Sequence, residues 1–325
     1  MSEYKGVWVY SENEDLAIEM LNIGSELATK LRTQLAALSI GNDAKNRAYN
    51  LTNYGADKVI VADNPELTTF NTDARLSLIT NLVKEHKPKI ILIGSTRRGK
   101  ELAARLATRL NAGCIPDCTK IGINEEGQLV TERVVYGGNA TVIQVIKTEP
   151  YIACVPLRTF EKPNFTDKKS EILNVNISQP ETSRIEHIEV KQIETTQGKI
   201  KDAKVVIVGG RGVEKKEDFQ ILENLAQALK GQCGYTRPLA EDRKWFKGNW
   251  IGLSGHKIKP ELYIGCGTAG LIQHIAGIRS SKIIVAINKD PEAPLNGIAD
   301  YVVIGDLYEI VPALTTALNR LLKSG

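Results

Sequence analysis

Short apolar runs alternate with longer amphipathic stretches along the first half of the chain. The spacing of apolar residues predicts strands at residues 6–10, 35–40, 58–61 and 89–93 and helices at residues 15–32, 44–54, 73–85 and 101–110. Strands that alternate with helices form a parallel, doubly wound sheet. The runs at residues 120–124, 129–136 and 140–147 have no long helix between them and indicate antiparallel strands, before residues 151–159 close the domain.

The second half of the chain begins with a change in composition. Residues 160–199 are polar, with only short β-like pieces such as 185–192, and are interpreted as a connector. Beyond it the pattern predicts helices at residues 271–278 and 307–322 and strands at residues 204–208, 261–265, 282–287 and 300–304. We therefore predict an α/β chain of two domains, residues 1–199 and 200–325, each a doubly wound, mostly parallel sheet.

Each strand predicted in the second domain ends in a turn that carries polar groups. These groups are Arg211, Gln273, His274, Asn288 and Asp306. Open parallel sheets bind ligands in the crevice beyond the carboxyl ends of their strands. Four strand ends with such groups are typical of a nucleotide-cofactor site.

The glycines after the 261–265 run support this interpretation. Gly265, Gly267 and Gly270 form a G-x-G-x-x-G pattern between a predicted strand and a predicted helix. In that context glycine allows close approach of a pyrophosphate, and the helix start favours an anion. The NAD version of the motif also needs an acidic residue at the end of the next strand, where this chain has Asn288. This counts against NAD and leaves other dinucleotides open.

Composition excludes several other classes of protein. The 325 residues suit two domains, and 42% hydrophobic and 25% charged residues are ordinary for a soluble protein. The net charge of +4 is small, and no basic-aromatic interleaving indicates nucleic-acid binding. No apolar run approaches the ~20 residues of a membrane helix, and the acidic N-terminal segment is unlike a secretory signal or a transit peptide. We expect a cytoplasmic protein without membrane insertion.

The five cysteines do not indicate a disulfide framework or a metal site. They are an odd number and widely scattered, and disulfides are rare in cytosolic chains. Cys114 and Cys118 have a possible ligand spacing, but no second Cys/His pair accompanies them. No metal site is predicted.

Several segments closely resemble the large (alpha) subunit of electron-transfer flavoproteins. PELYIGCGTAGLIQHIAG from Pro260 and KIIVAINKDPEAPLNGIADYVVIGDL from Lys282 match the C-terminal signature of that family. GGRG at 209–212 and IGLSG at 251–255 match it in order and spacing. DCTKI at 117–121 and VYGGNA at 135–140 match its N-terminal domain. The resemblance therefore spans most of the chain.

The resemblance implies an electron carrier. The chain would be the FAD-binding alpha subunit of a heterodimer with an electron-transfer flavoprotein beta subunit. It would accept electrons from acyl-CoA dehydrogenase-type flavoenzymes, as in fatty acid beta-oxidation, and pass them to a quinone reductase or another acceptor. The first domain would dock the partner subunit, and the second would be a Rossmann-like FAD-binding domain. Electron tunnelling needs no general base, nucleophile or metal, so no catalytic residue is predicted.

The resemblance also assigns contacts to the cofactor. Arg211 would contact the phosphate or adenosine part, and His274 would donate to the flavin's pyrimidine carbonyl. Arg237 would raise the reduction potential, and Ser254 would lie beside N5 with Thr236 as its polar neighbour. The expected contact set is Arg211, Thr236, Arg237, Ile251, Gly252, Leu253, Ser254, Thr268, Ala269, Gly270, Leu271, Ile272, Gln273, His274, Asn288, Asp306 and Leu307.

Three departures from the family pattern bear on specificity. Leu253 stands where the family usually has Gln, Ala269 where it has Ser, and His256 where it has Lys. Two hydrogen-bonding groups near the cofactor are lost, each worth about 1 kcal/mol. These changes put the redox potential and the dehydrogenase partner in doubt and suggest a specialised member of the family rather than the housekeeping fatty-acid carrier.

Two alternatives remain open from the sequence. One is an NAD(P)-dependent oxidoreductase that uses the G-x-G-x-x-G turn. The other is a non-catalytic scaffold subunit with a decayed nucleotide pocket, which Leu253 and Ala269 favour. The retained polar residues argue against it; they are Arg211, Arg237, His274 and Asp306.

One further motif, GSTRRGK at residues 94–100, follows a strand and opens a helix. This position suits a phosphate, but the motif lacks the lysine followed by Ser/Thr of the Walker loop. A structural turn, or a contact with the partner subunit, is the favoured interpretation.

Overall fold

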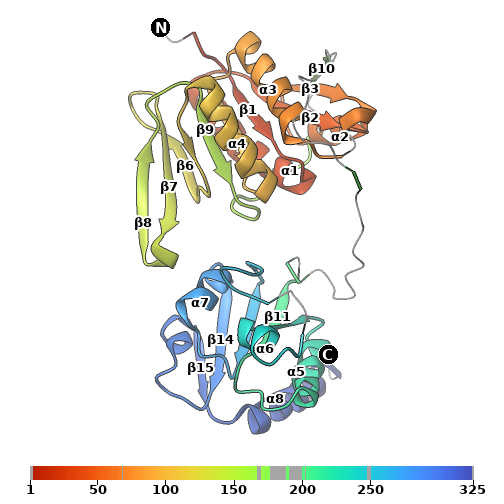
Figure 1. Cartoon of the computed structure of the whole chain (residues 1–325), viewed down its shortest axis with the longest axis vertical. Coiled ribbons are helices and arrows are strands. Elements are labelled where there is room, and N and C mark those ends of the chain that lie inside the picture. The colour runs from red at the N-terminus through yellow and green to blue at the C-terminus, as the bar shows by residue number, and fades with distance from the viewer. Residues whose placement is uncertain are drawn as a thin grey trace. The chain divides into compact units, whose positions relative to one another are not determined.

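The computed structural model describes residues 3–67, 69–166, 170–175, 188–189, 200–201, 203–246 and 250–323. The chain divides into two compact units (Figure 1). The first consists of Met1–Val135 and Asn139–Lys191, and the second of Gln192–Gly325 with Tyr136–Gly138. The β-like piece predicted at residues 185–192 lies almost entirely outside the described residues.

The first unit contains a seven-stranded, all-parallel sheet in the order β10-β3-β2-β1-β4-β9-β5. Its strands are β1 (Val7–Tyr10), β2 (Leu35–Gly41), β3 (Lys58–Asp63), β4 (Ile90–Gly94), β5 (Cys114–Ile115), β9 (Tyr151–Val155) and β10 (Glu171–Asn174). Its helices are α1 (Glu14–Leu31), α2 (Ala44–Thr52), α3 (Thr72–His86) and α4 (Arg97–Leu110), with a short 3-10 turn η1 (Pro65–Leu67). A second 3-10 turn, η2 (Tyr136–Gly138), is the segment grouped with the second unit. The predicted alternation of strands and helices is confirmed.

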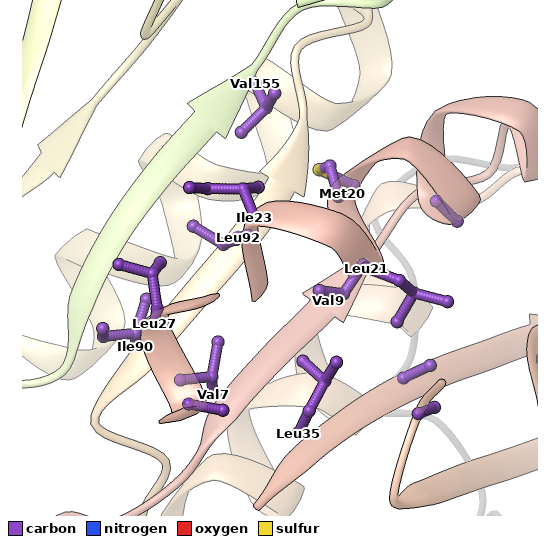
Figure 2. Packing of buried hydrophobic residues seen from close by; sticks show 14 of the residues in the cluster. Val7, Val9, Met20, Leu21, Ile23, Leu27, Leu35, Ile90, Leu92 and Val155 are labelled. Carbon is purple, nitrogen blue, oxygen red and sulfur yellow. The ribbon is translucent and has the colours of Figure 1, made fainter. Parts of the chain in front are cut away.

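The two faces of this sheet are covered by different helices. Val7 and Val9 of β1 pack against α1, together with Leu21 and Leu27 of that helix (Figure 2). The alternate residues Trp8 and Tyr10 face the side of α3 and α4. Both faces are buried, which is why the central strands are continuous apolar runs in the sequence.

A second, antiparallel sheet is formed by β6 (Lys120–Ile123), β7 (Leu129–Val135) and β8 (Ala140–Val145). This confirms the antiparallel arrangement predicted for the three runs that lack helices between them. The sequence missed β10, which lies inside the expected connector and pairs in parallel with β3 at the edge of the main sheet. Its four residues are too few and too polar to show a strand pattern, and pairing with β3 supplies what the local sequence does not.

The second unit contains a five-stranded, all-parallel sheet in the order β12-β11-β13-β14-β15. The strands are β11 (Val205–Gly209), β12 (Gln232–Tyr235), β13 (Leu262–Cys266), β14 (Ile283–Asn288) and β15 (Tyr301–Ile304). The helices are α5 (Gln220–Ala228), α6 (Arg237–Glu241), α7 (Ile272–Ile278) and α8 (Leu307–Lys323), with η3 (Glu217–Phe219) and η4 (Pro294–Ile298). Helices α5 and α8 cover one face and α7 the other, so the predicted doubly wound α/β class is confirmed for both units.

Within the part of the chain that the structure describes, no helix has both the length and the apolar character needed to cross a bilayer.

Candidate functional site

The candidate site lies at the carboxyl edge of the second unit's sheet. All five strands run in parallel, so the segments that follow them meet at one edge. The strand order reverses between β11 and β13, which makes that junction the topological switch point. Arg211 follows β11, Thr236 and Arg237 follow β12, Thr268 to Gln273 follow β13, and Asp306 follows β15, while Asn288 ends β14. The structure therefore brings the predicted polar positions to one edge.

The turns after β11 and β13 pack backbone against backbone. The N–H of Gly210 donates to the Cys266 carbonyl at 3.0 Å, and the N–H of Gly212 donates to the Gly267 carbonyl at 3.0 Å. A Cβ atom on Gly210 would lie 2.6 Å from the Cα of Thr268. Only glycine at Gly210 permits this approach, which fixes the two turns as one platform at the switch point.

Two of the G-x-G-x-x-G glycines are closely packed by the η4 segment. A Cβ atom on Gly265 would lie 2.7 Å from the Leu295 side chain, and one on Gly270 would lie 2.5 Å from the Leu295 backbone nitrogen. Gly270 also has a φ of +77°. The packing of the protein against these two positions therefore already requires glycine at both.

The start of α7 offers unpaired donors for an anion. Leu271 is the N-cap residue and its side chain accepts no capping bond. Within the described residues, the N–H groups of Ile272 and Gln273 have no hydrogen-bond partner, and the Ile272 side chain is 60% exposed. Free N–H groups at a helix start suit the diphosphate of a dinucleotide.

The loop at residues 251–255 is fastened to α7. The N–H of Leu253 donates to the Gln273 carbonyl at 2.7 Å, and Gly277 approaches Gly252 so closely that a Cβ atom would lie 2.6 Å from its Cα. A bridge from Thr236 to Ile251 joins the loop to the end of β12. The Ser254 hydroxyl accepts from the Trp250 indole at 3.2 Å, so its own proton is available to donate.

His274 lies in a buried network that involves both of its ring nitrogens. Nδ1 is 3.0 Å from the Ile251 carbonyl, which can only accept, so Nδ1 carries the proton. Nε2 then accepts from the Tyr263 hydroxyl at 2.7 Å. Burial lowers the pKa of His274 to about 4, against the smaller opposing effect of the Ile251 hydrogen bond, so the ring is neutral at pH 7.

This network bears on one prediction from the sequence. We expected His274 to donate to the flavin's pyrimidine carbonyl, but in the structure its only N–H is used by Ile251. The side chain instead fixes the loop at residues 251–255 against α7. Tyr263, which the sequence did not single out, is its partner; no strand-end pattern marks a residue in the middle of β13.

The two arginines differ in their surroundings. The Arg211 side chain is exposed and forms no hydrogen bond or ion pair with the described residues, so it is available to a ligand. Arg237 forms an ion pair with Glu241 at 2.5 Å, one helical turn further along α6. Glu241 therefore offsets part of the charge that the sequence assigns to Arg237.

Three further predicted contacts have structural partners. The Asn288 amide donates to the Thr268 carbonyl at 3.0 Å and accepts from the Asp290 N–H at 3.1 Å. One carboxylate oxygen of Asp306 caps α8 by accepting from the Tyr308 N–H at 2.8 Å. Leu307 is 6% exposed and packs in the core beneath Gly267, which leaves only its backbone for a cofactor contact.

The described part of this edge contains no candidate metal site. Among the described residues, no group of three or more His, Cys, Asp or Glu side chains could hold a metal ion.

Comparison with known proteins gives a consistent result. Residues 7–180 match the electron transfer flavoprotein domain, and residues 199–279 match the electron transfer flavoprotein FAD-binding domain. Electron transfer flavoprotein subunit alpha of Clostridium acetobutylicum is 38% identical, with 96% of each chain covered. The subunit alpha of Bacillus subtilis is 35% identical over 93% of this chain and 94% of its own length. Lactate dehydrogenase (NAD(+),ferredoxin) subunit LctC of Acetobacterium woodii is 33% identical over 98% of this chain and 78% of its own length.

Proposed function

Since the chain belongs to the electron transfer flavoprotein family and carries its FAD-binding domain, we propose that this electron carrier holds one FAD at the carboxyl edge of the β12-β11-β13-β14-β15 sheet. The observation that supports this placement is the convergence of Arg211, the unpaired start of α7 and the loop at residues 251–255 on one switch point. The proposed contacts are the predicted set, with His274 changed from a flavin donor to a residue that positions the loop.

Bound FAD supplies the uptake and release of electrons. The protein's own groups bind and orient it. Arg211 and the N–H groups of Ile272 and Gln273 neutralise the diphosphate, and the Ser254 hydroxyl donates a hydrogen bond from the loop. Arg237 contributes positive charge, reduced by Glu241. The Tyr263–His274–Ile251 network holds the loop at a fixed distance from α7.

The proposed partners are a beta subunit, with which this chain forms a heterodimer, an acyl-CoA dehydrogenase-type donor, and a quinone reductase or other acceptor. The first unit, which matches the electron transfer flavoprotein domain, is the proposed docking part for the beta subunit. We place this complex in the cytoplasm and propose no enzymatic activity for the chain by itself.

A second candidate is a fixed subunit of a substrate-oxidising complex. The name of the Acetobacterium woodii relative supports it, because that protein is a subunit of a lactate dehydrogenase. The stand-alone NAD(P)-dependent oxidoreductase is less well supported, since Asn288 replaces the acidic ribose contact and both ends of its amide hold the turn.

Cofactor content tests the proposal. The full chain is purified with its small partner subunit, its visible spectrum is recorded, and the cofactor is released by heat and identified. One FAD per FAD-binding unit and a 1:1 heterodimer in gel filtration are expected. A colourless preparation that also fails to take up added FAD contradicts the proposal.

A further inference from the structure

Two arginines carried by helices converge at the carboxyl edge of the first unit's sheet. Arg47 comes from α2 and Arg75 from α3. A Cβ atom on Gly41, the last residue of β2, would lie 2.7 Å from Nη2 of Arg47 and 3.6 Å from Nη2 of Arg75. The two guanidinium groups therefore both lie close to Gly41, at the end of β2.

Neither guanidinium is neutralised within the described residues. Arg47 donates to the Ile40 carbonyl at 2.9 Å, and Arg75 donates to the Leu67 carbonyl at 3.1 Å and the Thr69 carbonyl at 3.5 Å. No carboxylate of the described part of the chain forms an ion pair with either one. Arg75 is nevertheless 5% exposed, and a buried charge is ordinarily paired.

Buried polar atoms without partners surround these arginines. The Tyr10 hydroxyl at the end of β1, the Nε atoms of Arg47 and Arg75, and one carboxylate oxygen of Glu12 have no described hydrogen-bond partner. Tyr10 is 1% exposed. Burial raises its pKa to about 12, the nearby Arg75 opposes this, and so the hydroxyl keeps its proton and can donate.

A purely structural alternative is that Arg75 acts as a clamp, since its hydrogen bonds to the Leu67 and Thr69 carbonyls hold the segment before α3. The Arg75 side chain can also donate to the Tyr10 oxygen. A clamp does not explain why the Tyr10 hydroxyl proton and the two Nε atoms are buried without an acceptor, and each buried unsatisfied donor is destabilising. Three buried donors without acceptors, on two side chains that meet at Gly41 and on a third at the end of β1, are suited to an acceptor with several oxygens.

The start of α4 lies beside this place. Phe70 is contacted by the Arg75 guanidinium at 4.3 Å and by the Arg98 guanidinium at 4.8 Å from its ring centre. Arg98 belongs to the GSTRRGK motif, whose Thr96 caps α4 and also donates to Glu12. A helix start adds positive potential to that of the arginines.

Glu12 restricts the choice of anion. Its second carboxylate oxygen is buried and accepts no described hydrogen bond, and its negative charge contributes to the raised pKa of Tyr10. A fully deprotonated anion would meet repulsion there, whereas a phosphate group with a P–O–H, or with a neighbouring sugar hydroxyl, can donate to the carboxylate.

We propose that Arg47, Arg75, Tyr10 and the start of α4 form a second ligand site in this protein, in the first unit, which binds the phosphate group of a small molecule. Glu12 accepts a hydrogen bond from that ligand and selects phosphate over sulfate. The site is independent of the FAD-binding edge in the second unit.

Calorimetric titration of the FAD-loaded full chain with inorganic phosphate, ribose 5-phosphate and sulfate tests the proposal. Loaded FAD keeps the probes out of its own site. We expect saturable binding of phosphate or ribose 5-phosphate at one site per chain, and sulfate binding at least about tenfold weaker. Tighter binding of ribose 5-phosphate identifies a sugar phosphate as the source, and tighter binding of phosphate identifies the free ion.

Variants connect that binding to the named residues. Arg47→Met and Tyr10→Phe should each weaken phosphate binding at least about tenfold, or about 1.4 kcal/mol, and Glu12→Gln should reduce the preference over sulfate. Tyr10→Phe removes one hydroxyl and Arg47 is half-exposed, so both proteins should fold even if Arg75→Met does not. The control is Arg32→Met, at the exposed C-cap of α1.

Three results would overturn the inference. They are the absence of binding by either phosphate probe, binding that Arg47→Met and Tyr10→Phe leave unchanged, and an equal loss in Arg32→Met. Equal affinity for sulfate would overturn the role of Glu12. The FAD content of all variants should stay that of the wild type, which separates this test from that of the proposed function.

Discussion

The two units carry positively charged groups at the carboxyl edge of a parallel sheet, but the groups come from different places. In the second unit they follow the strands directly, as Arg211 does after β11 and Arg237 after β12. In the first unit they come from helices, Arg47 from α2 and Arg75 from α3, and meet only above Gly41. Strand-end groups share an edge by topology alone, whereas helix-borne groups need the packed fold to meet.

The edges also differ in how their polar groups are satisfied. At the second edge Asn288, Asp306 and His274 have partners in the protein, and the free donors are the exposed Arg211 and the start of α7. At the first edge the free donors are buried. The exposed donors of the second unit suit a large cofactor that lies across the edge, and the buried donors of the first unit suit a small group that enters it.

The largest expected effect concerns the interlocked turns of the second edge. Gly210→Ala places a methyl group against the backbone of Gly267 and Thr268, neither of which can move without breaking the sheet edge. We expect a loss of about 3 kcal/mol in the stability of the second unit and loss of FAD. Urea denaturation followed by flavin fluorescence measures both. Gly297→Ala is the control, since its Cβ atom would meet nothing within 4 Å; equal losses in the two variants would refute the interlock.

The second unit should lose stability in acid. The folded-state pKa of His274 is about 4, below the ordinary 6.5, because of burial. The unfolded state then binds the extra proton between pH 6.5 and 4, so stability is fully present above pH 6.5 and falls as the pH is lowered towards 4. The expected loss for the second unit is about 3 kcal/mol.

Denaturation of the wild type and of His274→Leu at pH 7 and pH 4.5 measures this loss. The variant lacks the titrating ring, so its second unit should show a smaller dependence on pH. A pH dependence that is the same in both proteins would show that His274 is not the titrating group.

A smaller effect concerns the Arg237–Glu241 pair. Arg237→Gln should lower the flavin reduction potential and Glu241→Gln should raise it, because Glu241 offsets the guanidinium charge. A partly exposed charge near the ring is worth about 1 kcal/mol, or on the order of 20 mV for a two-electron couple. Potentiometric titration would contradict this if both variants shifted in the same direction.

Most of the fold could be predicted from the sequence where the local pattern and the packing agree. The strands β1, β2, β4 and β9 are buried on both faces and therefore consist of apolar residues, and α1 carries its apolar stripe at helical spacing. β10 and β12 were missed because each is short and takes its conformation from a neighbouring strand. Helix α5 was also missed, although Leu222, Leu225 and Ala226 lie at helical spacing and are buried.

The candidate site divides in the same way. The positions of Arg211, Asn288 and Asp306 at one edge could be predicted, because each lies at or directly after a strand end. The second partner of His274 could not, because Tyr263 faces it from within β13. The ion pair of Arg237 with Glu241 and the meeting of Arg47 with Arg75 likewise depend on side-chain directions that residue types alone do not give.

The most direct test of the account is the FAD affinity of one arginine variant from each edge, measured by flavin fluorescence on the full chain. Arg211→Ala removes an exposed guanidinium that is proposed to bind the diphosphate, and it should weaken FAD binding at least about tenfold, since a hydrogen bond to a charged group is worth about 1.5–3 kcal/mol. Arg47→Met should leave FAD affinity unchanged. If Arg47→Met weakens FAD binding and Arg211→Ala does not, the placement of FAD at the carboxyl edge of the second unit is wrong.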